Sequence, residues 1–84
     1  MSESIIATIM PALDSMPAHT LDERITRVAN WLDSREQLIN ASAKVGCQAA
    51  QDIQALMLHL TIPPTLTQIE QLEAAARSFE QVVI

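Results

Sequence analysis

The sequence predicts an all-α fold, a small bundle of three to four helices that oligomerisation completes. Three observations support this expectation. The 84 residues contain one glycine and no tyrosine. Their β-branched residues are scattered and do not alternate with polar ones, as the strands of a half-buried sheet would require. Apolar residues instead recur at spacings of three and four, the period of an α-helix with one buried face.

The first predicted helix covers residues 4–16 and is short and bent. Pro11 lies inside this stretch, where a proline removes a backbone donor and clashes with the preceding helical turn. We therefore expect the helix to bend at Pro11 and to end near Ser15. Ser2 or Ser4 would cap its N-terminus. Its buried face would consist of apolar residues at helical spacing: Ile5, Ile6, Ile9, Met10 and Leu13.

The second predicted helix begins at the sequence TLDERI, where Thr20 and Glu23 have the spacing of a capping box. Apolar residues then stay on one face, and no proline occurs between residues 20 and 60. A single helix over those residues would be about 60 Å long at about 1.5 Å per residue, too long for a compact bundle. Two alternatives remain. Either the central helix breaks near Gly46, or it is a long rod supported by a second copy of the chain.

A C-terminal helix is expected after Pro63-Pro64, because the two prolines end the preceding helix. Two overlapping capping boxes are candidates for its start, Thr67 with Glu70 and Thr65 with Gln68. Its apolar residues alternate between spacings of three and four, which is typical of a coiled-coil seam. They are Ile69, Leu72, Ala76, Phe79 and Val83.

Ten acidic and five basic side chains give the chain a net charge of −5. This balance argues against direct binding of nucleic acid, which requires basic groups that neutralise phosphates. The carboxylates occupy ordinary solvent-facing positions. Asp22 and Glu23 favour a helix start, and Glu73 has the i,i+4 spacing of an ion pair with Arg77. Acid–base catalysis is therefore not indicated.

The length suits one helical domain over residues 1–84, which would bury about 60–65% of its unfolded surface. A single cysteine cannot form an internal disulfide, so a reducing cytoplasm is the expected compartment. The N-terminal stretch MSESIIATIMPALDSM has neither a basic leader nor an apolar run that could cross a membrane. We expect a cytoplasmic protein with no membrane partner.

Metal, cofactor and catalytic sites are not expected. The only soft metal ligands are His19, Cys47 and His59, and no two of them have the spacing of a metal-binding motif. A nucleophilic Cys47 would need an oriented base and a third group, and the sequence offers neither. The sequence therefore predicts a protein that is not an enzyme.

The second helix carries an arginine–tryptophan stripe with two interpretations. Its members lie on one flank at spacings of three, four and four. As a partner-binding site, the stripe would dock an acidic protein, because tryptophan and arginine are enriched in binding hot spots. As a core edge, the indole would be covered by arginine stems. The residues are Arg24, Arg27, Trp31 and Arg35.

The segment IQALMLHLTI carries more apolar residues than one helix face can bury in a monomer. Together with the coiled-coil-like last helix, this excess predicts self-association, although a fully enclosed central helix remains the alternative. The residues assigned to self-association are Leu56, Met57, Leu60, Ile69, Leu72 and Phe79.

The only glycine and the only cysteine stand side by side in a run of small residues, SAKVGCQAAQ. Small residues four apart allow a second helix to approach closely, which favours a packing role over a hinge or a reactive thiol. On this interpretation Gly46→Leu damages packing and Cys47→Ala is nearly silent. The set assigned to close packing is Ala43, Gly46, Cys47 and Ala50.

The function these features predict is regulation through protein–protein interaction. An acidic, homo-oligomeric helical protein suits the masking of a basic DNA-binding regulator, in the manner of an antirepressor. Two alternative functions would use the same apolar helix surface. One is an export or assembly chaperone that sequesters a helical client, and the other is a structural subunit of a larger assembly.

Overall fold

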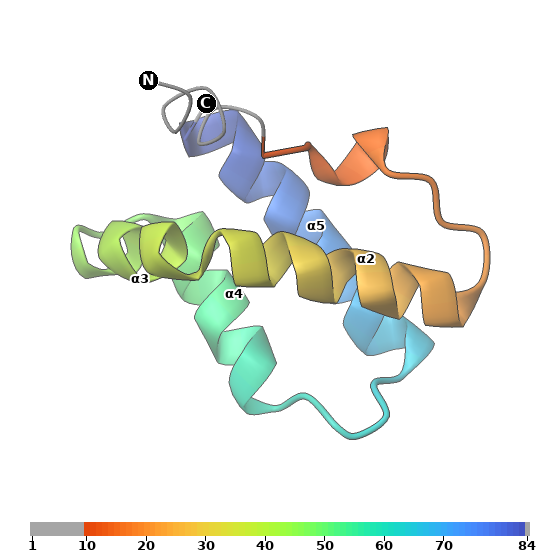
Figure 1. Ribbon diagram of the computed structural model, residues 1–84. Coiled ribbons are helices and arrows are strands. Elements are labelled where there is room, and N and C mark those ends of the chain that lie inside the picture. Colours follow the sequence, from red (N-terminus) through yellow and green to blue (C-terminus); the bar gives the residue numbers. More distant parts are fainter. Residues whose placement is uncertain (1–9, 84) are drawn as a thin grey trace.

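The computed structural model describes residues 10–83, and within this range the chain forms one 3-10 turn and four α-helices (Figure 1). The all-helical prediction is therefore confirmed for this part of the chain. In order, the elements are η1 (Leu13–Ser15), α2 (Leu21–Ser34), α3 (Glu36–Lys44), α4 (Gln48–Leu58) and α5 (Leu66–Val83).

The expected helix over residues 4–16 is corrected within the described range. Only η1 is helical there, and positions 4–9 of that prediction lie outside the described residues. Pro11 precedes the turn instead of bending a longer helix, and Ala12 is extended. Met16 is also extended, because it stands before Pro17, and a following proline disfavours helical backbone.

The start of α2 follows the prediction. The backbone N–H of Glu23 donates to Thr20 Oγ1 at 3.1 Å, and the Glu23 carboxylate accepts from the Thr20 backbone at 3.2 Å. The same carboxylate accepts from the backbone N–H of His19 at 2.7 Å. The predicted capping box is confirmed, and it also fixes the loop that enters the helix.

The central segment is broken twice, so the rod alternative is wrong. The break near Gly46 was predicted. Gly46 has a φ of +97°, its N–H donates to Ala43 O, and the N–H of Cys47 donates to Ser42 O. These two bonds form a Schellman motif, the common way to end a helix with glycine.

The second break, at Arg35, was not predicted. Its backbone N–H donates to Leu32 O, three residues back, and not to Trp31 O. This shift leaves the Trp31 carbonyl without its helical backbone partner. Side chains donate to it instead, Ser34 Oγ at 2.9 Å and Arg35 Nη1 at 3.4 Å.

The start of α5 uses the overlapping capping box. Gln68 N–H donates to Thr65 Oγ1 at 3.2 Å, and Gln68 Oε1 accepts from Thr65 N at 3.0 Å. Gln68 also accepts from Thr61 Oγ1 at 2.8 Å, which ties the loop between α4 and α5 to the helix start. The Thr67–Glu70 alternative is therefore wrong, because the helix begins at Leu66 and Thr67 already lies inside its first turn.

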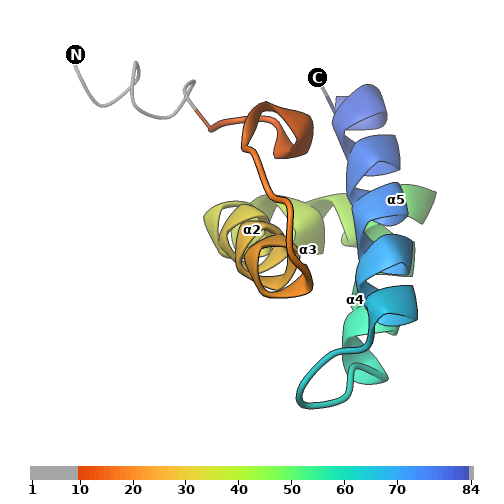
Figure 2. The same cartoon turned by 90° about the vertical axis from the view of Figure 1, so that its right-hand side faces the viewer.

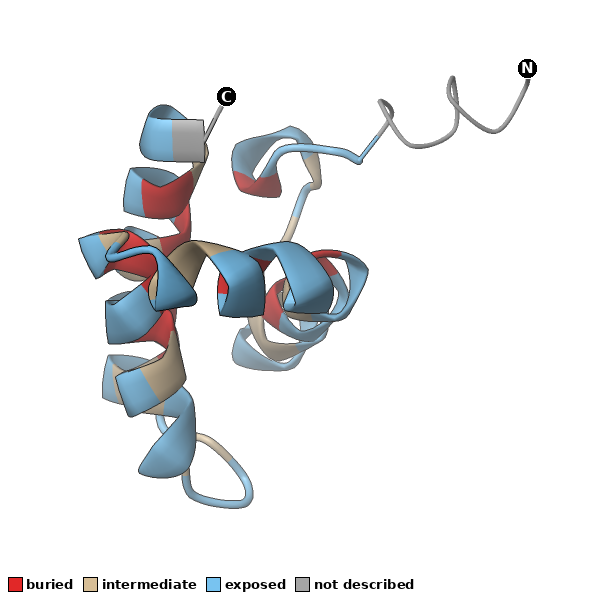
Figure 3. Cartoon of the chain, turned by 90° about the vertical axis from the view of Figure 1, so that its left-hand side faces the viewer, coloured by how far each residue is buried: buried red, intermediate tan, exposed pale blue. Residues whose placement is uncertain are grey.

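Helices α4 and α5 run antiparallel as a hairpin (Figure 2). α3 packs on α4, while α2 crosses α5 and η1 touches both α2 and α5. The buried positions lie on the facing sides of these helices, as Figure 3 shows. The only two aromatic rings, Trp31 and Phe79, meet edge to face with centroids 5.9 Å apart. Among residues 10–83, no helix is both long and apolar enough to cross a membrane.

Candidate functional site

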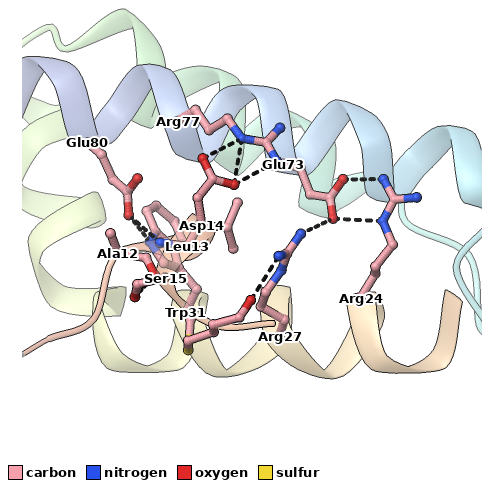
Figure 4. A network of polar contacts seen from close by, with 11 residues as sticks. Ala12, Leu13, Asp14, Ser15, Arg24, Arg27, Trp31, Glu73, Arg77 and Glu80 are labelled. Atoms are coloured by element: carbon pink, nitrogen blue, oxygen red, sulfur yellow. Dashed lines mark hydrogen bonds and ion pairs between the residues drawn. The ribbon is translucent and has the colours of Figure 1, made fainter. Parts of the chain in front are cut away.

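The arginine–tryptophan stripe of α2 faces α5, and its first two arginines converge on Glu73 (Figure 4). Arg24 donates from Nε to Glu73 Oε2 at 3.1 Å and from Nη2 to the other carboxylate oxygen. Arg27 Nη2 donates to Glu73 Oε2 at 2.9 Å, and its Nη1 donates to Met16 O at 3.0 Å. One carboxylate thus holds two guanidinium groups.

Glu73 is only 2% exposed, which corrects its assignment to a solvent-facing position. Burial alone would raise the pKa of this carboxyl. The hydrogen bond from Arg24 outweighs burial, and with the bond from Arg27 and the charges of both arginines it lowers the pKa below its ordinary value of 4.5. Glu73 is therefore an ionised group whose negative charge two cations and their hydrogen bonds compensate.

Trp31 is the next member of the stripe, seven residues after Arg24. Its indole Nε1 donates to Glu80 Oε2 at 2.7 Å, and the same oxygen accepts from the backbone N–H of Leu13 at 2.8 Å. Trp31 is 1% exposed. Glu80 therefore joins α2, α5 and η1 at one point.

Arg35 completes the stripe from the break between α2 and α3. Its guanidinium carbon lies 4.6 Å from the Trp31 ring centroid, a cation–π arrangement. Its Nη2 donates to Pro11 O at 2.7 Å and lies 4.0 Å from Glu80 Oε2. Burial lowers the pKa of Arg35, and the charge of Glu80 partly opposes this effect. Arg35 thus fixes the segment before η1.

These contacts correct the partner-binding assignment of the stripe. Trp31 and Arg35 are buried, and Arg24 and Arg27 are occupied by Glu73, so none is presented to a partner in this conformation. The core-edge interpretation describes all four side chains. We call the set the α2–α5 polar network: Arg24, Arg27, Trp31, Arg35, Glu73 and Glu80.

Sequence reasoning missed the two acidic members of this network. A signal was present, because Glu73 and Glu80 are seven residues apart, as are Arg24 and Trp31. A spacing of seven returns a side chain to nearly the same helix face. Matched spacings allow both pairs to form along one seam, and the contacts of Arg24 with Glu73 and of Trp31 with Glu80 show which residues are paired.

A second tie joins η1 to α5. Arg77 donates from Nε and Nη2 to the Asp14 carboxylate at distances of 2.9 to 3.1 Å. This hydrogen-bonded pair lowers the pKa of Asp14. The pairing expected between Glu73 and Arg77 is therefore replaced, because each has a closer partner on another element.

The self-association assignment is corrected at three positions. Ile69, Leu72 and Phe79 are buried in the chain's own core, so the seam of α5 packs against this chain and not against a second one. Leu56 and Leu60 are half-buried and pack at the edge of the same core. Only Met57 of the assigned residues is exposed, at 48%.

The small residues do not form one packing face. Ala50 is fully buried, and Ala43 and Cys47 pack beside the core. Gly46 is different, because a Cβ added there would meet no atom within 4 Å. The predicted packing role of Gly46 is therefore wrong. The residue instead adopts the positive φ that the turn after α3 requires. Cys47 precedes α4 as its N-cap and makes no capping hydrogen bond with its side chain.

A groove opens between the α2–α3 bend and α4, with a volume of about 500 Å³. Its lining combines apolar side chains with two carboxylates and contains no basic residue. Gln54 Nε2 donates to Asn40 Oδ1 at 2.9 Å, which ties α4 to α3. We call this feature the acidic groove, and its lining residues are Leu32, Asp33, Glu36, Ile39, Asn40, Gln54, Met57 and Leu58.

The sequence could not have indicated the groove, because its walls are set by the break at Arg35 and the turn at Gly46. Asp33 and Glu36 are exposed, as the sequence predicts for them. No group of three metal-ligating side chains gathers among residues 10–83.

Comparisons of the chain with protein-family models, with curated proteins and with solved structures find no match.

Proposed function

We propose that this chain is a small acidic regulatory protein that acts by binding a basic protein, without catalysis. The supporting observation is that the arginines are paired within the chain, whereas most carboxylates of the described residues are not. All four arginines make ion pairs with carboxylates inside the chain. Six carboxylates are exposed and form no ion pair among the residues described: Asp22, Glu23, Asp33, Glu36, Asp52 and Glu70.

A surface of this kind attracts proteins of opposite charge. Lys44 is the one basic residue in the described range that makes no ion pair there. Acidic surfaces raise the association rate with basic partners and suppress binding of acidic ones. The basic proteins that bind nucleic acid through their charged face fit this surface. The role we propose is therefore that of an antirepressor-like inhibitor of a DNA-binding regulator, acting in the cytoplasm.

Self-association belongs to the same proposal. Two large apolar side chains at the α4–α5 connection lie outside the acidic groove and are exposed, Ile62 at 99% and Leu66 at 47%. Such exposure in a small chain favours contact with another protein surface. Static light scattering at micromolar concentration should show a dimer or a larger discrete assembly, and a clean monomer would remove oligomerisation from the proposal.

The regulatory role is tested by identification of the partner followed by competition with DNA. Affinity purification from the native cell with mass spectrometry should recover a DNA-binding regulator. That regulator, bound to a fluorescent operator, should release the DNA when this protein is added, as measured by anisotropy. Direct binding of the regulator to this protein, measured without DNA, should weaken as salt rises, because the attraction is screened.

Other results would reassign the protein. Recovery of a secreted or filament subunit in a stable one-to-one complex would identify a chaperone. Self-assembled particles without any partner would identify a structural subunit. Substrate turnover that Cys47→Ser abolishes would identify an enzyme.

A further inference from the structure

We infer that the acidic groove binds an amphipathic helix of the partner, with apolar side chains against its floor and lysine or arginine side chains at its rim. This inference rests on the proposed function, because it names the part of a basic partner that is recognised. Helix-in-groove docking needs an apolar floor wide enough for side chains at helical spacing. It also needs a rim whose charge selects the partner.

The floor of the groove is apolar and adaptable. Of its lining residues, Ile39 is buried and Leu32 is half-buried. Met57 and Leu58 line the groove from α4 and are exposed. Methionine is flexible and fits apolar surfaces of varied shape. A volume of about 500 Å³ has room for several aliphatic side chains.

The rim of the groove is negative. Asp33 and Glu36 line the α2–α3 wall, and no basic residue lines any part of the groove. The opposite wall is the last turn of α4, which ends at Leu58. The C-terminal end of a helix carries a partial negative charge, so this wall also favours a cation. Both walls therefore attract the flanking lysines or arginines of a docked helix.

A second copy of this chain does not match this requirement. The arginines of α2 and α5 in each copy are held by internal carboxylates, which leaves Lys44 as the unpaired basic residue of the described range. A second copy would bring further exposed carboxylates toward Asp33 and Glu36. Charge complementarity thus favours a different, basic protein.

The test uses two synthetic helical peptides with the same leucine face. One carries lysines at all other positions, and the other carries glutamates. The lysine peptide should bind, and in ¹⁵N spectra its amide shifts should concentrate on residues 32–40 and 54–58. The glutamate peptide should bind at least tenfold more weakly, on the order expected from charge reversal at a rim. Equal binding of both peptides, or shifts centred elsewhere, would overturn the inference.

Matched variants distinguish binding in the groove from non-specific attraction to the acidic surface. Asp33→Asn with Glu36→Gln should weaken binding of the lysine peptide about tenfold, since two rim contacts are lost. Asp52→Asn with Glu70→Gln changes the net charge equally, and neither residue lines the groove, so binding should stay within about twofold. Equal losses from the two double variants would show non-specific attraction and contradict the inference.

The apolar floor has its own matched pair. Leu58→Gln removes an exposed leucine from the groove and should weaken binding several-fold, while Val82→Gln alters an exposed valine of α5 outside the groove and should not. Circular dichroism on each variant confirms that the helices persist. Dimerisation of the protein alone, with amide shifts in the groove, would assign the groove to a second copy and overturn the inference.

The two proposals fail in different ways. A captured DNA-binding regulator could bind the Asp33→Asn, Glu36→Gln variant as tightly as the original protein. The proposed function would then stand, and the groove would not be the binding site. If the lysine peptide binds in the groove but purification recovers no regulator, the groove stands and the proposed function is wrong.

Discussion

Arg27 on α2 and Glu73 on α5 form an ion pair with an N···O distance of 2.9 Å, and both side chains are largely shielded from water. The pair connects residues 46 positions apart in the chain. A charge placed in such a position costs free energy unless it is paired and hydrogen-bonded. The network around Glu73 therefore acts mainly by fixing how α2 lies on α5.

The substitution Glu73→Gln should destabilise the protein by about 3 kcal/mol, because two arginines lose the carboxylate that compensates them. Urea unfolding followed by circular dichroism measures the loss. Glu70→Gln is the matched control, since Glu70 is exposed one turn earlier on the same helix. Its effect should stay within about 0.5 kcal/mol. Equal midpoints for the two variants would show that the buried network contributes nothing.

Stability should fall in acid, and Glu73 should account for part of the fall. The arginine contacts lower the pKa of Glu73 below 4.5 in the folded protein. The contact with Arg77 lowers that of Asp14 below 3.8. The unfolded chain therefore binds more protons, so the stabilisation is complete well above pH 4.5 and is lost as pH falls through the folded values. Urea midpoints at pH 7, 5, 4 and 3 check this.

The variant Glu73→Gln is the control for that titration. It lacks the buried carboxyl and should lose less stability between pH 5 and pH 3 than the original protein. The same decline in both proteins would mean that the acid sensitivity comes from other groups.

Substitution of Trp31 should damage the fold and not a binding surface. Trp31→Ala removes a buried ring that contacts Phe79 and Arg35, and the expected loss is about 3–5 kcal/mol. Trp31→Phe keeps a ring but removes the N–H that Glu80 accepts, with an expected loss of about 1–3 kcal/mol. Thermal unfolding by circular dichroism ranks the variants. A Trp31→Ala protein of unchanged stability and weakened partner binding would restore the hot-spot interpretation.

The features predictable from the sequence are the local ones. The capping box of Thr20 and Glu23 involves residues three apart, and glycine at position 46 marks a helix end by its own backbone preference. Prolines at 63 and 64 separate the last two helices in the same way. Each signal lies within one helical turn, so no knowledge of packing is needed.

The features that were missed depend on contacts across the fold. Glu73 resembles the exposed flanking charge of a coiled coil until α2 is laid against α5 and brings Arg24 and Arg27 to it. The contact of Arg35 likewise spans the fold, because its guanidinium donates to the carbonyl of Pro11, 24 residues earlier. Helix periodicity places a side chain on a flank, but it does not say what that flank will meet.

The two overlapping capping boxes before α5 provide a matched pair of variants. Thr65→Ala should destabilise the protein by about 1 kcal/mol, because it removes the acceptor for the Gln68 N–H. Thr67→Ala, two residues later and also exposed, should change the stability by less than about 0.5 kcal/mol. Urea midpoints decide between them, and the reverse order would place the helix start two residues later.

The turn between α3 and α4 should respond to the backbone preference of the residue at position 46 and not to its size. Gly46 has a φ of +97°, and the space beside it is open. Gly46→Ala and Gly46→Leu should therefore destabilise the protein by similar amounts, about 1 kcal/mol each, since both carry a Cβ into a conformation that L residues avoid. Gly46→Asn should cost less, because asparagine tolerates left-handed backbone.

The neighbouring Val45 provides the control for this series. It is exposed and has a φ of −95°, so Val45→Ala introduces no strain and should change the stability by less than about 0.5 kcal/mol. Unfolding midpoints for the four variants test the order. If Gly46→Leu were far more damaging than Gly46→Ala, a second helix would have to approach this turn closely. That result would restore the packing role and point to a partner chain at the turn.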